Sequence, residues 1–164
     1  MQAVKTKTTN TDVGLAPEGT EAIAEKVNGY LADLQVLYAK LHNFHWNIEG
    51  ESFFTLHEEL QEIYESVAEE IDDVAERVLQ IGHRPLTRLS DYPGAARLEE
   101  AESRPYTGRE IAETLVADYK AVIAELRELI KVAQEHEDEG TADEAVGWMK
   151  DKEKTTWMLT AYLS

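Results

Sequence analysis

The chain has no cysteine among its 164 residues, which excludes a disulfide framework and thiolate chemistry. Basic residues are also scarce, with 16 Lys and Arg against 33 Asp and Glu, so the net charge is −17. Such a surface is a poor match for DNA phosphates and attracts cations instead. No apolar run approaches the length of a membrane span, and the polar N-terminus has no apolar signal-peptide region. We therefore expect a soluble, cytoplasmic protein with one sizeable core.

Proline and glycine are few, and they divide the chain into long helical stretches. Residues 1–17 are polar and end at Pro17, which predicts a flexible tail followed by a single domain over residues 18–164. Apolar residues at spacings of three and four predict four helices, over about 20–47, 53–81, 107–135 and 141–164. Three of the four prolines lie in residues 82–106, which predicts a long connection that carries a short helix near 95–100.

The lengths of the connections determine the expected topology. A short break over 48–52, the long segment 82–106 and a short acidic link before Thr141 predict two helical hairpins joined by one crossover. This is the all-α, ferritin-like four-helix bundle, here without a fifth helix. Two capping boxes, Thr107 with Glu110 and Thr141 with Glu144, predict the starts of the last two helices.

Four residues have the spacing of a metal site that is split in two. His45 and His57 stand on either side of the break at Gly50, which folds the chain back and brings them close together. Asp72 and Glu76 share a side of the second helix with His57, but Asp72 lies about 22 Å further along its axis. One ion cannot bind both sets from one helix. An antiparallel second copy would join the histidines of one chain to the acids of the other, at two equivalent sites.

The segment Leu37–Leu86 resembles the Dps family, the mini-ferritins of starved bacteria. The resemblance rests on the motifs His45-Trp46-Asn47, Phe53-Phe54-Thr55-Leu56-His57-Glu58 and Asp72-Asp73-Val74-Ala75-Glu76-Arg77, and it extends from about residue 20 to the C-terminus. It implies a hollow homododecamer that protects the cell from oxidative damage. Ferroxidase sites at its two-fold interfaces would oxidise Fe²⁺, preferably with hydrogen peroxide, and a ferric mineral would be stored inside. Zinc or manganese could occupy the same ligands.

Two residues near these ligands have roles that the resemblance leaves open. Gln61 stands where the family commonly has an acid, and its neutral carbonyl oxygen should bind iron more weakly. We therefore expect two irons per site, one tight and one weaker. Trp46 adjoins His45 and is either an electron donor, as the resemblance suggests, or an aromatic residue that packs.

Asp138, Asp143 and Glu144 gather near the start of the last helix. In the Dps family, acids in this region line pores on the three-fold axes and draw cations into the cavity. Acids are also favoured at a helix N-terminus by the helix dipole alone, so both explanations stay open. The resemblance further suggests that Arg77 pairs with Glu153 across an assembly interface.

Two other functions compete with the ferroxidase. The first is a nucleoid-associated DNA-binding particle, for which the polar tail offers only Lys5 and Lys7, so DNA binding is expected to be absent or weak. The second is a haem-containing bacterioferritin, which needs an axial methionine on the two-fold face. Met149 and Met158 fall on the last predicted helix instead, and an absent Soret band would remove this alternative.

Overall fold

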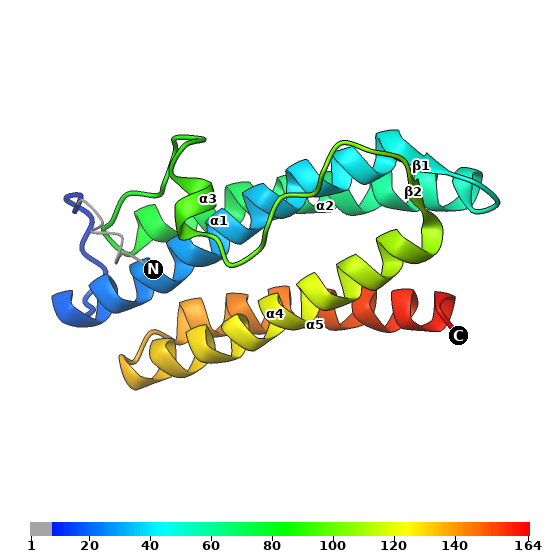
Figure 1. The fold of residues 1–164 in the computed structure, drawn as a ribbon. Coiled ribbons are helices and arrows are strands. Elements are labelled where there is room, and N and C mark those ends of the chain that lie inside the picture. The colour runs from blue at the N-terminus through cyan, green and yellow to red at the C-terminus, as the bar shows by residue number, and fades with distance from the viewer. Residues whose placement is uncertain (1–7) are drawn as a thin grey trace.

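A computed structural model describes residues 8–164, which form five helices and two short strands (Figure 1). In chain order these elements are α1 (Pro17–Asn47), β1 (Ile48–Glu49), α2 (Phe53–Gln80), α3 (Tyr92–Ala95), β2 (Tyr106–Thr107), α4 (Gly108–Glu135) and α5 (Glu139–Tyr162). The predicted all-α, four-helix architecture is confirmed. In this part of the chain no helix follows α5, and none has the length and apolarity that crossing a membrane requires.

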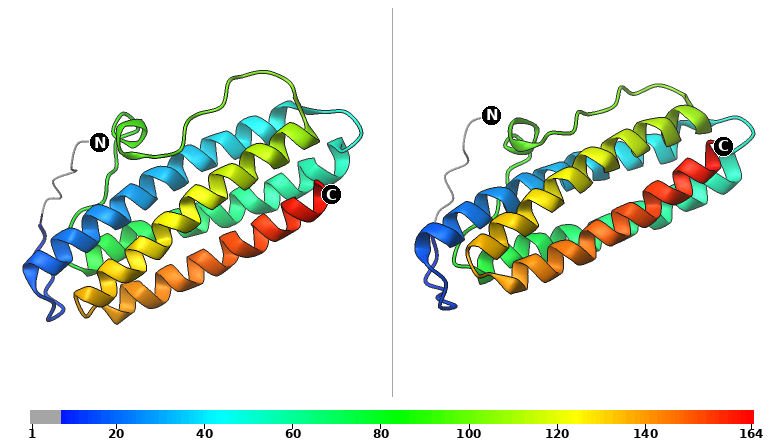
Figure 2. Two further views of the ribbon diagram at one scale, coloured as in Figure 1. Left: turned by 60° about the horizontal axis from the view of Figure 1, so that its bottom comes forward. Right: turned by 90° about the horizontal axis from the view of Figure 1, so that it is seen from below.

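The four long helices form two antiparallel hairpins, α1 with α2 and α4 with α5 (Figures 1 and 2). The crossover from α2 to α4 runs along the length of the bundle beside α1, and it carries the one-turn helix α3. At the far end β1 and β2 pair in parallel, with Ile48 opposite Tyr106 and Glu49 opposite Thr107. This pairing ties the end of α1, where His45 lies, to the start of α4.

Apolar side chains from all four long helices fill the bundle, because each helix buries one stripe at spacings of three and four. Leu34, Leu60 and Leu115 are fully buried representatives of this core. A buried charged pair lies among them: Lys152 of α5 binds Glu70 of α2, and the Tyr30 hydroxyl donates to the same carboxylate.

Two helix boundaries differ from the prediction. α1 begins at Pro17 rather than near residue 20, because proline presets the helical φ at the first position and needs no hydrogen-bond acceptor there. The short helix occupies Tyr92–Ala95 rather than 95–100. It ends early because the carboxylate of Asp33 accepts the backbone N–H groups of Arg97 and Leu98 at 2.6 and 3.2 Å, which holds that segment against α1.

The two predicted capping boxes have different outcomes. At α4 the box is confirmed: Thr107 accepts from the Glu110 N–H, and the Glu110 carboxylate accepts from the Thr107 N–H at 2.8 Å. At α5 the prediction is wrong, because the helix begins at Glu139 with Asp138 as its N-cap. The Asp138 carboxylate accepts the Thr141 N–H at 3.0 Å, so Thr141 lies inside the first turn.

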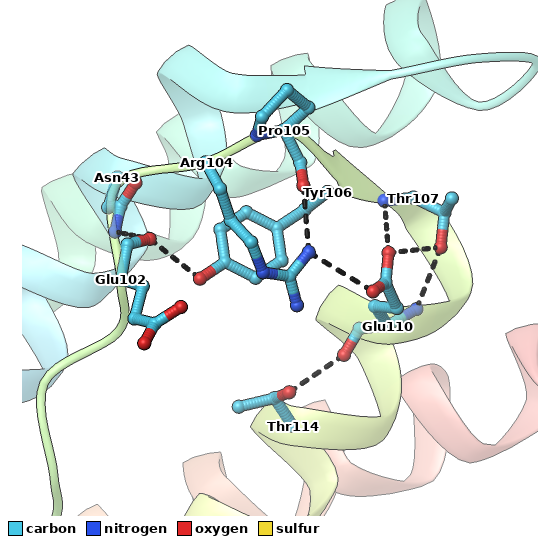
Figure 3. Close-up of polar contacts among 8 residues, drawn as sticks. All are labelled: Asn43, Glu102, Arg104, Pro105, Tyr106, Thr107, Glu110 and Thr114. Carbon is cyan, nitrogen blue, oxygen red and sulfur yellow. Dashed lines mark hydrogen bonds and ion pairs between the residues drawn. The ribbon is translucent and has the colours of Figure 1, made fainter.

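The crossover meets α1 again at Asn43, near the C-terminal end of that helix (Figure 3). The Asn43 side-chain amide donates to the carbonyls of Ala101 and Glu102, both at 3.0 Å. The Arg104 guanidinium lies 4.0 Å from the centre of the Tyr106 ring and also pairs with Glu110. The Asn43 bonds attach the crossover to α1 two residues before His45, and the Arg104 contacts attach it to the start of α4.

Candidate metal site

His45 and His57 lie against each other where α1 turns into α2. The turn between them depends on Gly50, whose φ of +97° is a conformation that other residues rarely adopt. The two rings stack with their centres 3.7 Å apart and their planes 18° from parallel. His45 is buried and His57 is partly exposed, so the pair lies at the edge of the molecule. The predicted proximity of the two histidines is therefore confirmed.

Two reciprocal hydrogen bonds fix the chemical form of this histidine pair. Nδ1 of His45 lies 2.8 Å from the His57 carbonyl oxygen, and Nδ1 of His57 lies 2.8 Å from the His45 carbonyl oxygen. A carbonyl can only accept, so each Nδ1 carries a hydrogen. The Nε2 of each neutral ring is then left with its lone pair, and neither Nε2 has a hydrogen-bond partner within residues 8–164. Histidines that bind metals characteristically donate their other ring N–H to a carbonyl or carboxylate in this way.

Aromatic side chains enclose the pair on both sides. Phe53 stacks on His57 with ring centres 5.0 Å apart, and Tyr64 meets His45 edge-on at 5.3 Å. The role of Phe53 and Tyr64 beside the pair was missed from the sequence. Their signal was present, since Phe53 precedes His57 by one helical turn and Tyr64 follows it by two.

His42 and Trp46 continue this aromatic group toward solvent. His42 stacks on Tyr64 with ring centres 4.1 Å apart, and its Nδ1–H donates to the Tyr38 carbonyl at 2.9 Å. Trp46 lies 5.2 Å from His42 and is 70% exposed. Trp46 is therefore available on the face that carries the histidine pair.

The two acids of the predicted site do not reach the histidines of their own chain. Asp72 and Glu76 are exposed on α2 and form no ion pair or hydrogen bond with the described residues. Within residues 8–164, no group of three or more histidines and acids is placed to hold a metal ion. Within one chain the predicted ligands therefore form two separate groups, the histidines at the start of α2 and the acids further along it.

Gln61 projects from the exposed side of α2, one turn after His57. Its side-chain nitrogen donates to the Glu65 carboxylate at 2.8 Å. The Gln61 carbonyl oxygen is left without a partner among the described residues. It is the only atom of this side chain that can bind a cation.

The three acids near the start of α5 have unlike surroundings. Asp138 is 3% exposed, and its carboxylate binds Arg77 at 2.7 Å as well as capping the helix. Glu144 is partly buried 3.6 Å from Arg77, and this burial raises the pKa of its carboxyl group. Asp143 is exposed.

Arg77 pairs with acids of its own chain, Asp138 and Glu144, while the suggested pairing with Glu153 concerns an interface between two chains. The Arg77 guanidinium binds Asp138 and donates from Nε to the Thr141 hydroxyl at 2.8 Å. Glu153 instead pairs with Arg127 of α4 at 2.6 Å. The suggested pair would join two chains, so it stays a prediction beside these contacts within one chain.

The two hairpins, the single crossover and the histidine pair at the bundle edge define a protein of the ferritin-like class. A family model for the ferritin-like domain matches residues 24–164. The DNA protection during starvation protein of Brevibacillus brevis is 43% identical over 147 residues, covering 87% of this chain and 95% of that protein. DNA protection during starvation protein 2 of Bacillus anthracis is 39% identical over 142 residues, covering 87% of this chain and 97% of that protein.

Solved structures agree with these relatives. A Dps protein from Vibrio cholerae O1, described as one of the ferritin-like diiron-carboxylate proteins, superposes with a TM-score of 0.90 at 33% identity and covers 96% of this chain and 99% of its own. A Dps protein from Bacillus brevis superposes with a TM-score of 0.88 at 38% identity and covers 92% of this chain and 100% of its own. The chain belongs to the Dps family.

Proposed function

We propose that this protein is a ferroxidase and iron store whose sites are completed by a second copy of the chain. The observation that carries the proposal is the pair of reciprocal hydrogen bonds between His45 and His57, which leaves two Nε2 lone pairs beside each other. Membership of a family with a ferritin-like diiron-carboxylate member supports iron as the metal. Imidazole and carboxylate are ligands that suit Fe²⁺, and carboxylates also stabilise the ferric product.

In this proposal Asp72 and Glu76 of a second chain complete the site. They are exposed and unpaired within the described chain, and their distance of about four to five helical turns from His57 suits an antiparallel α2 from a two-fold partner. Ala68 lies between His57 and Asp72, and Ala75 lies between the two acids; their small side chains would allow the two helices to approach closely. Each dimer would hold two equivalent sites, and six dimers would form the hollow dodecamer.

The reaction that we propose consumes hydrogen peroxide: two Fe²⁺, one H₂O₂ and two protons give two Fe³⁺ and two water molecules. Iron is the substrate, and the ferric product is stored as mineral in a cytoplasmic particle. Removal of Fe²⁺ and peroxide together prevents them from forming hydroxyl radicals. Trp46, exposed on the same face, is positioned to supply an electron when only one iron is bound. Zinc and manganese would compete for the same ligands.

The test is anaerobic addition of Fe²⁺ to the assembled protein, followed by peroxide in one portion and air in another. Ferric absorbance in the near ultraviolet is recorded for the native chain, His57→Ala and the control His136→Gln. We expect fast oxidation with peroxide, slow oxidation with air, and a loss of at least about tenfold in His57→Ala alone. Equal rates in all three proteins would show that the histidine pair is not the site of oxidation.

A DNA-binding particle is the second candidate, because several relatives carry the name DNA protection during starvation protein. The net charge of −17 opposes it. Lys5 and Lys7, the cations of the N-terminal tail, lie outside the described residues. A gel-shift assay at low salt separates the candidates, since retarded DNA with an inactive metal site would favour the DNA-binding function.

A further inference from the structure

Residues 8–16 lie along the turn that ends α2, and we call them the N-terminal strap. Thr9 donates its backbone N–H to the Gly82 carbonyl at 2.7 Å, and Thr8 pairs with His83 in an antiparallel bridge. Leu15 packs against the core. Segments held to the body of a protein by a short run of backbone contacts open at a lower free-energy cost than its core helices.

Gly82 shapes the turn to receive the strap. Its φ is +87°, and a Cβ at this position would lie 2.7 Å from the Thr11 carbonyl oxygen. Any side chain here would therefore strain the turn and displace the strap. The closeness of this approach shows that docking of the strap and the form of the turn are fitted to each other.

His83 lies beneath the strap and is 4% exposed. Its Nε2 is 3.0 Å from the Thr20 hydroxyl oxygen, and that hydroxyl donates its only hydrogen to the Pro17 carbonyl at 3.0 Å. Nε2 must therefore carry a hydrogen and donate it to Thr20. Burial lowers the pKa of His83, and Glu21 of α1 opposes this effect to a smaller extent.

Other charged groups surround this region. Asp12 of the strap and Glu18 of α1 line the same hollow as His83. The neighbouring Arg84 is exposed, and His136, at the end of α4, packs against Gly19 next to Thr20. These groups set the local field, but among the histidines it is His83 that the strap covers.

We propose that protonation of His83 releases the N-terminal strap, so that the strap is docked at neutral pH and free in acid. The docked state favours the neutral ring, because a buried imidazolium loses hydration. Docking is therefore stable above the ordinary histidine pKa of about 6.5 and weakens as the pH falls through it. Release would lengthen the chain that precedes α1 by the nine strap residues and so extend the reach of Lys5 and Lys7.

Hydrogen exchange with mass spectrometry on the assembled full chain tests this at about pH 7.5 and 5.5, after correction for intrinsic exchange rates. In the native protein, protection of strap amides such as Thr9 should fall several-fold at the lower pH, up to the limit of about tenfold that a released histidine pKa of about 6.5 sets. His83→Gln retains a side-chain N–H for Thr20 but does not titrate, so the strap of this variant should stay protected at both pH values. In Gly82→Ala the strap amides should lose protection at both pH values, and this variant provides the reference for a released strap.

His136→Gln is the matched control, because it removes a second histidine near the same end of α1. It should keep the native pH response. The proposal is overturned if native protection is the same at both pH values, if His83→Gln still loses protection in acid, or if His136→Gln abolishes the response.

Discussion

The imidazole rings of His45 and His57 are held in their metal-binding form by main-chain carbonyls rather than by other side chains. Each histidine supplies the carbonyl that orients the other, at 2.8 Å in both directions. No substitution elsewhere can remove these two acceptors without moving the backbone itself. The pair therefore needs only the correct turn between α1 and α2, which explains why residue spacing alone was enough to predict it.

At Gln61 we predict that the charge of one side chain sets the occupancy of the weaker metal position. Gln61→Glu should convert one strong and one weak iron position into two of similar occupancy, because a carboxylate binds iron better than a neutral amide oxygen. Anomalous diffraction from crystals soaked in Fe²⁺ measures both occupancies. Gln134→Glu, exposed on α4, adds the same charge elsewhere and should change neither. Two equally occupied irons in the native protein would disprove the role of Gln61.

At the scale of elements, the crossover is held in place by single buried polar side chains of α1. Asp33 is fully buried and binds the Arg97 guanidinium at 2.7 Å in addition to the two backbone N–H groups beyond α3. Asn28 accepts the Leu86 N–H at 2.8 Å. The proline content of residues 82–106 predicted an irregular connection, but the end of α3 depends on these distant carboxylate and amide groups. Local sequence therefore could not position the short helix.

We predict that Asp33→Ala loosens the crossover and destabilises the chain by about 3 kcal/mol, because it leaves two N–H groups without acceptors and Arg97 without its buried partner. Thermal unfolding at matched protein concentration gives the loss of stability, and hydrogen exchange over residues 84–106 shows where it occurs. The stability of Asp33→Asn, which keeps one acceptor oxygen, should lie between that of the native chain and that of Asp33→Ala. Asp151→Ala, on the exposed side of α5, is the control. Unchanged exchange over the crossover in Asp33→Ala would contradict this role.

At the scale of the whole molecule, the sequence predicted the two hairpins, the crossover and the histidine pair, because helical periodicity and connection lengths determine these. It predicted neither the cap at Asp138 nor the contact between the strap and Gly82. The strap contact depends on the turn after α2, which is distant in the chain, whereas the Asp138 cap is a local hydrogen bond from the N–H of Thr141, the residue that the sequence had suggested as the cap. Asp72 and Glu76 were predicted from the sequence as ligands, and in the proposed site their placement beside the histidines requires a second copy.

Asp143 gives a prediction for the assembled particle. If its exposed carboxylate lines a pore, Asp143→Asn should slow iron uptake about threefold or more at low ionic strength and leave assembly intact. The difference should shrink as salt is added, because added ions screen the attraction. Stopped-flow uptake with light scattering measures both properties, and Asp151→Asn is the control for loss of a charge on α5. Unchanged uptake in Asp143→Asn would refute the pore role.

A mixed assembly tests whether the site is shared between two chains. One variant lacks the histidines (His45→Ala with His57→Ala) and the other lacks the acids (Asp72→Ala with Glu76→Ala), and each alone should be inactive. In a mixed two-fold dimer, the intact histidines of one chain meet the intact acids of the other at one of the two sites. Random pairing of equal amounts makes half of the dimers mixed, so co-expression should restore about a quarter of native ferroxidase activity. If native mass spectrometry shows mixed particles that remain inactive, the ligands do not come from two chains. The recovered quarter cannot arise from a site within one chain, since neither variant carries a complete set.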